Sequence, residues 1–134
     1  MEPRKGAIAV IRRDERFLVI QRSQSVTAPG MYCFPGGEIE DGELESQTII
    51  RELHEELGLD GVEPIRSVWR SVTQRGVHLS WWLTNIAVDA MINPNPAEVA
   101  AVAWWTKQRM LSDDMLLVSN REFLQSLARG DFAL

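Results

Sequence analysis

The chain has 134 residues, 45% of them hydrophobic and 25% charged, and this size and composition are typical of one globular domain over residues 1–134. Its formal net charge is −5 and no basic run is longer than Arg12-Arg13, which argues against binding to a nucleic-acid polymer. Cys33 is the only cysteine, and the sequence shows neither a signal-peptide-like segment nor an apolar stretch long enough to span a bilayer, so we expect a cytoplasmic protein without internal disulfides or membrane contacts.

The N-terminal quarter of the chain predicts a hairpin, a loop and a brief strand. Residues 5–11 and 17–21 are apolar and rich in β-branched side chains, and they flank a charged turn, so they predict a β-hairpin whose arms enter a sheet. The polar segment after them ends in Pro29-Gly30, which predicts a loop. A brief strand at residues 31–34 then stops at a Pro-Gly-Gly sequence.

A helix is predicted from about residue 42 or 43 to Gly58, because glycine suits the left-handed conformation that commonly ends a helix. At about 100° per residue, Glu52, Glu55 and Glu56 crowd one face of this helix within about 100°. Like charges at that spacing repel one another, and clustered carboxylate oxygens suit a hard divalent cation. The acidic face therefore predicts a site for Mg²⁺ or Mn²⁺.

Other positions on the same helix support this arrangement. Glu45 returns to the acidic face from two turns earlier, whereas His54 points away from it and is expected to be solvated. Arg51 lies beside Glu55 and can hold a carboxylate in one rotamer by forked hydrogen bonds. The core-facing stripe beside the carboxylates comprises Ile49, Ile50, Leu53 and Leu57.

The second half of the chain predicts more strands and a closing helix. Residues 62–73 and 77–88 predict two strands around a Gln-Arg-Gly turn. An Asn-Pro-Asn-Pro loop precedes residues 99–106, which are apolar enough for a buried strand, and residues 120–129 predict a helix. Strands combined with a central and a terminal helix predict an α/β fold, an α/β/α sandwich with helices on both faces of a mixed sheet.

A set of residues at fixed spacing runs through the central helix and the loop before it. In chain order the set comprises Gly37, Glu43, Arg51-Glu52-Leu53, Glu55-Glu56 and Gly58-Leu59. These residues match the Nudix box at every one of its fixed positions over residues 37–59, so the chain resembles the Nudix hydrolase family. The heptapeptide 51–57 alone is more typical of a solvated acidic helix, and it is the glycine loop and Glu43 that favour the resemblance.

The resemblance implies a metal centre and a reaction. Glu55 and Glu56 match the family's main carboxylate ligands, and the Gly36 carbonyl matches a further ligand. Glu52 matches a position that belongs to the same metal site and that, in some relatives, orients or deprotonates the attacking water. The implied cofactor is Mg²⁺ or Mn²⁺, and the implied reaction is hydrolysis of a diphosphate bond in a nucleoside diphosphate linked to another group.

Five more residues acquire implied roles, and three of these have a plainer alternative. Arg51 and Glu43 match a pair that braces the loop against the helix. Glu98 matches another carboxylate near the metal and is the alternative general base, or it is a solvated loop glutamate. Arg22 matches an arginine that contacts the substrate, or it is a surface arginine. Asn120 matches an asparagine that contacts the base in relatives acting on oxidised purine nucleotides, or it is a helix N-cap.

Residues that the sequence lacks reduce the number of candidate substrates. A proline some 15 residues beyond the box, typical of relatives that cleave ADP-ribose, is absent, and so is the tyrosine of dinucleoside-polyphosphate enzymes. The chain is most similar to MutT-like pyrophosphohydrolases, which convert a nucleoside triphosphate, sometimes oxidised, to a nucleoside monophosphate and pyrophosphate. An ADP-ribose or nucleoside diphosphosugar pyrophosphatase is the alternative, and a nucleotide-sensing Nudix-like module is the non-enzyme alternative. Monomer and homodimer both stay open.

Overall fold

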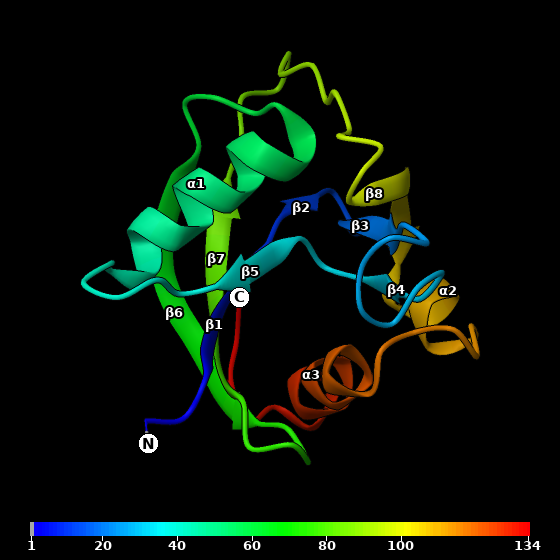
Figure 1. Cartoon of the computed structure of the whole chain (residues 1–134). Helices are drawn as coiled ribbons and strands as arrows, with labels where there is room; N and C mark the ends of the chain where they lie inside the picture. The colour runs from blue at the N-terminus through cyan, green and yellow to red at the C-terminus, as the bar shows by residue number, and fades with distance from the viewer. Residues whose placement is uncertain (1) are drawn as a thin grey trace.

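The computed structural model describes residues 2–134, and Figure 1 shows the arrangement of its strands and helices. In chain order they are β1 (Lys5–Val10), β2 (Arg12–Arg13), β3 (Arg16–Arg22), β4 (Tyr32–Cys33), β5 (Gly36–Glu38), α1 (Glu45–Leu57), β6 (Glu63–Val72), β7 (His78–Asn85), β8 (Val99–Thr106), α2 (Lys107–Leu111) and α3 (Val118–Arg129). None of the helices within residues 2–134 has both the length and the apolar character needed to cross a membrane.

The strands form two sheets. The first has the order β5-β1-β7-β6, in which β1 and β7 run parallel and the other neighbours run antiparallel, so it is mixed. In the second, β3 pairs antiparallel with β2, β4 and β8. Figure 1 shows α1 and α3 on opposite sides of these strands, which confirms the predicted α/β/α arrangement, although two sheets share the middle layer.

The predicted pairing of residues 5–11 with 17–21 is wrong. β1 lies in the first sheet and β3 in the second, and the hairpin partner of β3 is the two-residue β2. The chain leaves β1 at Ile11, whose carbonyl accepts a hydrogen bond of 3.0 Å from the Leu18 amide where the two sheets meet. Both apolar runs are covered by helices on both faces, so each occupies an inner position in its own sheet.

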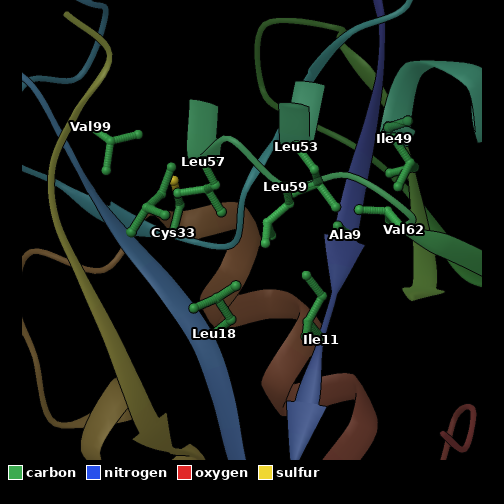
Figure 2. Close-up of a cluster of buried hydrophobic side chains, with 12 residues drawn as sticks. Ala9, Ile11, Leu18, Cys33, Ile49, Leu53, Leu57, Leu59, Val62 and Val99 are labelled. Carbon is green, nitrogen blue, oxygen red and sulfur yellow. The ribbon is translucent and has the colours of Figure 1, made fainter. Parts of the chain in front are cut away.

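Side chains along β1 and β3 alternate between two hydrophobic clusters. Ala7, Ala9 and Leu18 belong to the cluster on the α1 side, whereas Val10 and Phe17 belong to the cluster on the α3 side. Figure 2 shows the first cluster, with the α1 leucines above β1 and β3. Its other buried members include Ile49, Leu53, Leu57, Leu59 and Val62.

The boundaries of α1 follow from its end residues. The helix begins at Glu45, two residues later than predicted, because Glu43 stays in the loop and accepts hydrogen bonds from Thr48 Oγ1 and the Glu40 amide. At the other end Gly58 is left-handed, with φ of 63°, and its amide donates to the His54 carbonyl at 3.0 Å, as its position predicts.

The later strands and helices depart from expectation in three places. β8 was expected to be buried, but Val99 is its only fully buried residue, because β8 pairs with β3 alone. The short helix α2 was not predicted; Thr106 caps it by accepting a hydrogen bond from the Arg109 amide at 3.1 Å. α3 begins at Val118, so Asn120 lies inside its first turn and is not the N-cap.

Candidate functional site

A cavity of about 170 Å³ lies where α1, β5 and the end of β3 meet the loop before β8. It brings together Arg22, Gly36, Glu52, Glu56 and Glu98, which are distant in sequence. The remaining lining residues are Ile20, Val26 and Gly37. A larger cavity of about 340 Å³, between the N-terminal end of α1 and the first sheet, contains none of the predicted site residues.

Two glycines allow the close packing of β5, Gly37 against α1 and Gly36 against β1. A Cβ atom on Gly37 would collide with the Glu52 carboxyl group. Gly36 has φ of 155°, and a Cβ atom there would collide with the Ala7 carbonyl oxygen and lie 2.8 Å from the Ile8 Cα atom. Glycine is therefore required at Gly37 if the Glu52 carboxylate is to lie against this strand, and at Gly36 if the strand is to pair with β1.

The carboxyl group of Glu56 is almost fully buried at the base of the site. Its Oε1 accepts a hydrogen bond of 3.0 Å from the Gly36 amide. Burial and, to a smaller extent, the charge of Glu52 raise the pKa of Glu56 to about 8, against the opposing effect of the Gly36 hydrogen bond. Burial likewise raises the pKa of Glu52 to about 7, against the opposing effect of Arg51. Both groups thus hold protons near neutral pH unless a cation replaces them.

Arg51 connects α1 to the preceding loop. Its Nε and a terminal nitrogen donate to the two carboxylate oxygens of Glu43 at 2.8 and 2.9 Å, and it also donates to the Glu38 carbonyl at 2.9 Å. Its other terminal nitrogen lies 2.9 Å from Glu52 Oε1 and 3.4 Å from Glu55 Oε2. The Glu43–Arg51 brace that the resemblance implies is therefore present, and it also orients two carboxylates of the acidic face.

This brace predicts how the acid stability of the fold depends on pH. Hydrogen bonds from Arg51 and Thr48 lower the pKa of Glu43 from 4.5 to about 2. A carboxyl group whose pKa falls on folding stabilises the native state above its unfolded pKa, and that contribution disappears as the pH drops through the folded pKa. We expect Glu43→Gln to lower the melting temperature above about pH 5, with a difference from wild type that narrows toward pH 2.

The measurement is thermal unfolding followed by circular dichroism across that pH range. Glu122→Gln, the same substitution at an exposed position on α3, serves as the matched control and is expected to show no pH-dependent difference. A Glu43→Gln difference that stays constant with pH would contradict an ionic origin for the brace.

Glu98 is brought to the cavity by hydrogen bonds at the C-terminal end of α1. The amides of Asn93 and Asn95 donate to the carbonyls of Leu57 and Glu56, each at 2.8 Å. They thereby satisfy carbonyl groups that have no partner within the helix. The Glu98 carbonyl then accepts from the Ser23 amide at 3.0 Å, which fixes the loop to the end of β3. Glu98 therefore lines the cavity together with Glu52 and Glu56.

Arg22 is the cationic member of the cavity lining. Its Nε donates to the Thr27 carbonyl at 2.6 Å and a terminal nitrogen donates to Thr27 Oγ1 at 2.9 Å, so the loop after β3 holds the guanidinium in place. The charge of Arg22 lowers the pKa of the Cys33 thiol, but burial has the larger effect and raises this pKa to about 11. Arg22 is therefore held at the site by specific contacts and does not extend freely from the surface.

Three residues that were placed on the acidic face or near the substrate, Glu45, Glu55 and Asn120, do not line the cavity. Glu45 does not join the acidic face, because its carboxylate binds Arg70 at 3.1 and 3.2 Å and accepts from Trp82 Nε1 at 2.9 Å. Glu55 keeps 47% of its side chain exposed and does not line the cavity. Asn120 is buried and lies away from the lining, where its Oδ1 accepts from the Phe34 amide at 2.8 Å.

The tryptophans pack within the protein and do not line this cavity. Trp81 is fully buried and stacks on Phe123 of α3 with ring centroids 4.8 Å apart. Trp104 and Trp105 instead lie under the guanidinium groups of Arg13 and Arg109 respectively. Trp81 therefore belongs to the core, and the indole N–H of Trp82 donates to Glu45.

Sequence reasoning missed two contributors to the site. Thr48 is buried on α1 and donates to Glu43, but a threonine inside a helix carries no recognisable signal of such a role. Gly37 belongs to the box, yet its contact with the Glu52 carboxyl group depends on the approach of β5 to α1. Only the folded arrangement contains that information.

The donor set fits a hard divalent cation. Glu98 Oε2 is buried without a hydrogen-bond partner, and burial has already raised the pKa values of Glu52 and Glu56, so positive charge would relieve all three groups. Within residues 2–134, no three carboxylate, imidazole or thiol groups converge closely enough to enclose an ion as they stand. Glu52 and Glu55 both point toward Arg51, so ligation requires their side chains to rotate.

The chain resembles known proteins in both sequence and fold. A family model described as NUDIX domain matches residues 2–127. CTP pyrophosphohydrolase of Escherichia coli (strain K12) is 38% identical over 76 residues, which cover 55% of this chain and 56% of that protein. The 8-oxo-dGTP diphosphatase of Proteus vulgaris is 31% identical over 88 residues, which cover 62% of this chain and 79% of that protein.

The fold also has a close match among solved structures. The MutT protein from Methanosarcina mazei Go1 matches with a TM-score of 0.76 at 21% identity, over 97% of this chain and 96% of that one. At this identity the likeness concerns the fold, and it confirms the α/β/α sandwich.

Proposed function

Because the chain belongs to the NUDIX domain family, we propose that residues 1–134 act as a single metal-dependent hydrolase domain that cleaves a diphosphate bond in a nucleotide. The preferred substrate is a nucleoside triphosphate with a normal or an oxidised base, and the products are a nucleoside monophosphate and pyrophosphate. The names of the two relatives, which refer to CTP and 8-oxo-dGTP, support this choice of substrate class.

One observation supports the proposal most directly. Glu52, Glu56 and Glu98 share a cavity with Arg22, and Glu98 has a buried oxygen without a partner. Carboxylates in this arrangement suit a cation, and a neighbouring guanidinium suits a phosphate group. A cation that displaces the protons of these carboxyl groups would also offset the charge of a polyphosphate, so metal and substrate are expected to bind together.

Each site residue has a specific task in this proposal. The Gly36 carbonyl and the carboxylates of Glu52, Glu55 and Glu56 hold Mg²⁺ or Mn²⁺. Such an ion, when bound, offsets the charge of the phosphates and lowers the pKa of water. Arg22 orients a phosphate oxygen through its guanidinium group.

The remaining tasks concern proton transfer and support. Glu52 accepts the proton of the water that attacks phosphorus, and Glu98 is the alternative base. The bond between that phosphorus and the bridging oxygen then breaks, and pyrophosphate leaves. Arg51 and Glu43 keep the loop and α1 in register and do not contact the reacting atoms.

The test is an assay of CTP, 8-oxo-dGTP, the other nucleoside triphosphates and ADP-ribose with Mg²⁺ or Mn²⁺. We expect pyrophosphate and a nucleoside monophosphate from a triphosphate, complete loss of turnover with a chelator, and recovery when the ion is restored. Hydrolysis in ¹⁸O-labelled water identifies which product receives the water oxygen. Release of inorganic phosphate from triphosphates, or turnover that persists in the chelator, would overturn the proposal.

Two alternatives give different results in the same assay. An ADP-ribose or nucleoside diphosphosugar pyrophosphatase releases a sugar phosphate and leaves triphosphates intact. A nucleotide-sensing module binds nucleotide, which raises the melting temperature, but yields no product. The proposed cytoplasmic location and the choice between monomer and homodimer are separate questions, which fractionation and sedimentation address.

A further inference from the structure

The side chain of Asn120 reaches from α3 to the segment that carries the glycines of the site. Its Oδ1 accepts a hydrogen bond of 2.8 Å from the Phe34 amide, and both residues are buried. Its Nδ2 donates to Ser119 Oγ at 3.2 Å. Both polar atoms of this side chain therefore have partners inside the protein, and Asn120 does not line the cavity.

The Phe34 amide needs this partner because of its place in the chain. β4 ends at Cys33 in the second sheet and β5 begins at Gly36 in the first, so residues 34 and 35 cross between the sheets outside both ladders. A buried backbone N–H that lacks an acceptor is strongly unfavourable. Asn120 supplies the acceptor that no neighbouring strand supplies.

The crossing segment is fixed from three directions within three residues. Asn120 accepts from Phe34 on the α3 side, and the Ala9 amide donates to the Pro35 carbonyl at 2.8 Å. On the α1 side, Glu56 Oε1 accepts from the Gly36 amide at 3.0 Å. A displacement of Phe34 is therefore transmitted to the Gly36 backbone and to the Glu56 carboxylate.

We propose that Asn120 is a positioning residue for the metal site, which holds Phe34 and thereby sets Gly36 against Glu56, and that it does not contact the base of the nucleotide. The inference rests on the proposed function and replaces the base contact that the family resemblance implies for Asn120. Contact with a base would require this side chain to leave its buried partners, and Phe34 would then lose its acceptor.

The experiment compares Asn120→Leu, which removes the acceptor at similar volume, with Asn120→Asp, which keeps Oδ1. Mn²⁺ affinity is measured without nucleotide by electron paramagnetic resonance of the free ion, and kcat and KM are measured for CTP and 8-oxo-dGTP. Leu127→Ala, in the later part of α3, is the control for loss of stability. Amide hydrogen exchange at Phe34 reports directly on the hydrogen bond.

For Asn120→Leu we expect Mn²⁺ affinity and kcat to fall by about 10- to 100-fold, the range typical of residues that support metal ligands, with faster exchange at the Phe34 amide. The ratio of kcat/KM between the two nucleotides is expected to stay at its wild-type value. Asn120→Asp is expected to recover most of the affinity, and Leu127→Ala to leave it unchanged.

Different results would overturn the proposal in recognisable ways. A changed nucleotide ratio with unaltered Mn²⁺ affinity assigns Asn120 to the base. Equal loss of affinity in Asn120→Leu and Leu127→Ala reduces its role to general stability. If the wild type binds Mn²⁺ but hydrolyses no nucleotide, the proposed function fails, and the Mn²⁺ affinities of the variants still support or overturn the positioning role. Absence of Mn²⁺ binding by the wild type overturns both proposals.

Discussion

Glu56→Gln is expected to lower kcat by about a thousandfold or more while the fold stays intact. Glutamine has nearly the volume of glutamate and keeps an Oε1 atom that can accept the 3.0 Å hydrogen bond from the Gly36 amide. It lacks the negative charge that would hold a divalent ion and offset the charge developing on the phosphates. Steady-state kinetics with the best nucleotide of the panel, at saturating Mg²⁺, measures the effect.

In the metal-free protein at alkaline pH, the same substitution is expected to stabilise the fold relative to wild type. The pKa of Glu56 rises from 4.5 to about 8 on folding, so the native state keeps a proton that the unfolded state releases. Wild-type stability therefore decreases as the pH increases through this range, whereas a glutamine has no proton to lose. In a chelator, the melting temperature of Glu56→Gln relative to wild type should increase from about pH 5 to about pH 9.

Glu122→Gln, on the exposed face of α3, is the matched control for both measurements and should resemble wild type in each. Retention of more than a tenth of the wild-type kcat by Glu56→Gln would remove Glu56 from the ligand set. A melting-temperature difference that does not change with pH would mean that Glu56 titrates normally in the native state.

Gly36→Ala is expected to lower the free energy of unfolding by about 3 kcal/mol, because it adds both overpacking and backbone strain. Its Cβ atom would collide with the Ala7 carbonyl oxygen and lie 2.8 Å from the Ile8 Cα atom, and both neighbours are backbone atoms of β1 in the middle of the first sheet. Neither neighbour can rotate away. Urea unfolding measures the loss.

Gly37→Ala separates this backbone effect from an effect on the site. The atoms nearest to its Cβ would be those of the Glu52 carboxyl group, and that side chain can rotate. We therefore expect a change of less than about 1 kcal/mol in the free energy of unfolding, together with a large loss of kcat as Glu52 moves. Equal destabilisation by the two substitutions would show that the environments of the two glycines do not differ as described.

The sequence predicts α1 and its acidic face well because both follow from local periodicity. Glu52, Leu53 and Glu56 take their faces from 3.6 residues per turn, and Gly58 ends the helix by its own conformational preference. The fate of Glu45 depends on Arg70 and Trp82, which come from β6 and β7. A helical wheel cannot contain that information.

Strand pairing is the part of the fold that local patterns leave undetermined. Residues 5–11 and 17–21 have the apolar, β-branched composition of strands, but composition does not specify a partner, and the chain changes sheets at Ile11. The short helix α2 depends on a single cap by Thr106, which is too weak a signal to recognise. The contact between Asn120 and Phe34 spans 86 positions in sequence, so no local pattern predicts it.

The loop that carries Glu98 also determines where the protein tolerates additional residues. Its second half is fixed to α1 through Asn93 and Asn95, so a change of length there would withdraw Glu98 from the cavity. Its tip is a turn, closed by a hydrogen bond of 3.0 Å from the Ala90 amide to the Ala87 carbonyl, and the central residues face solvent, since Val88 is 88% exposed and Asp89 is exposed as well. A peptide tag or a fluorophore inserted between these two residues can therefore be accommodated without altering the chemistry of the site.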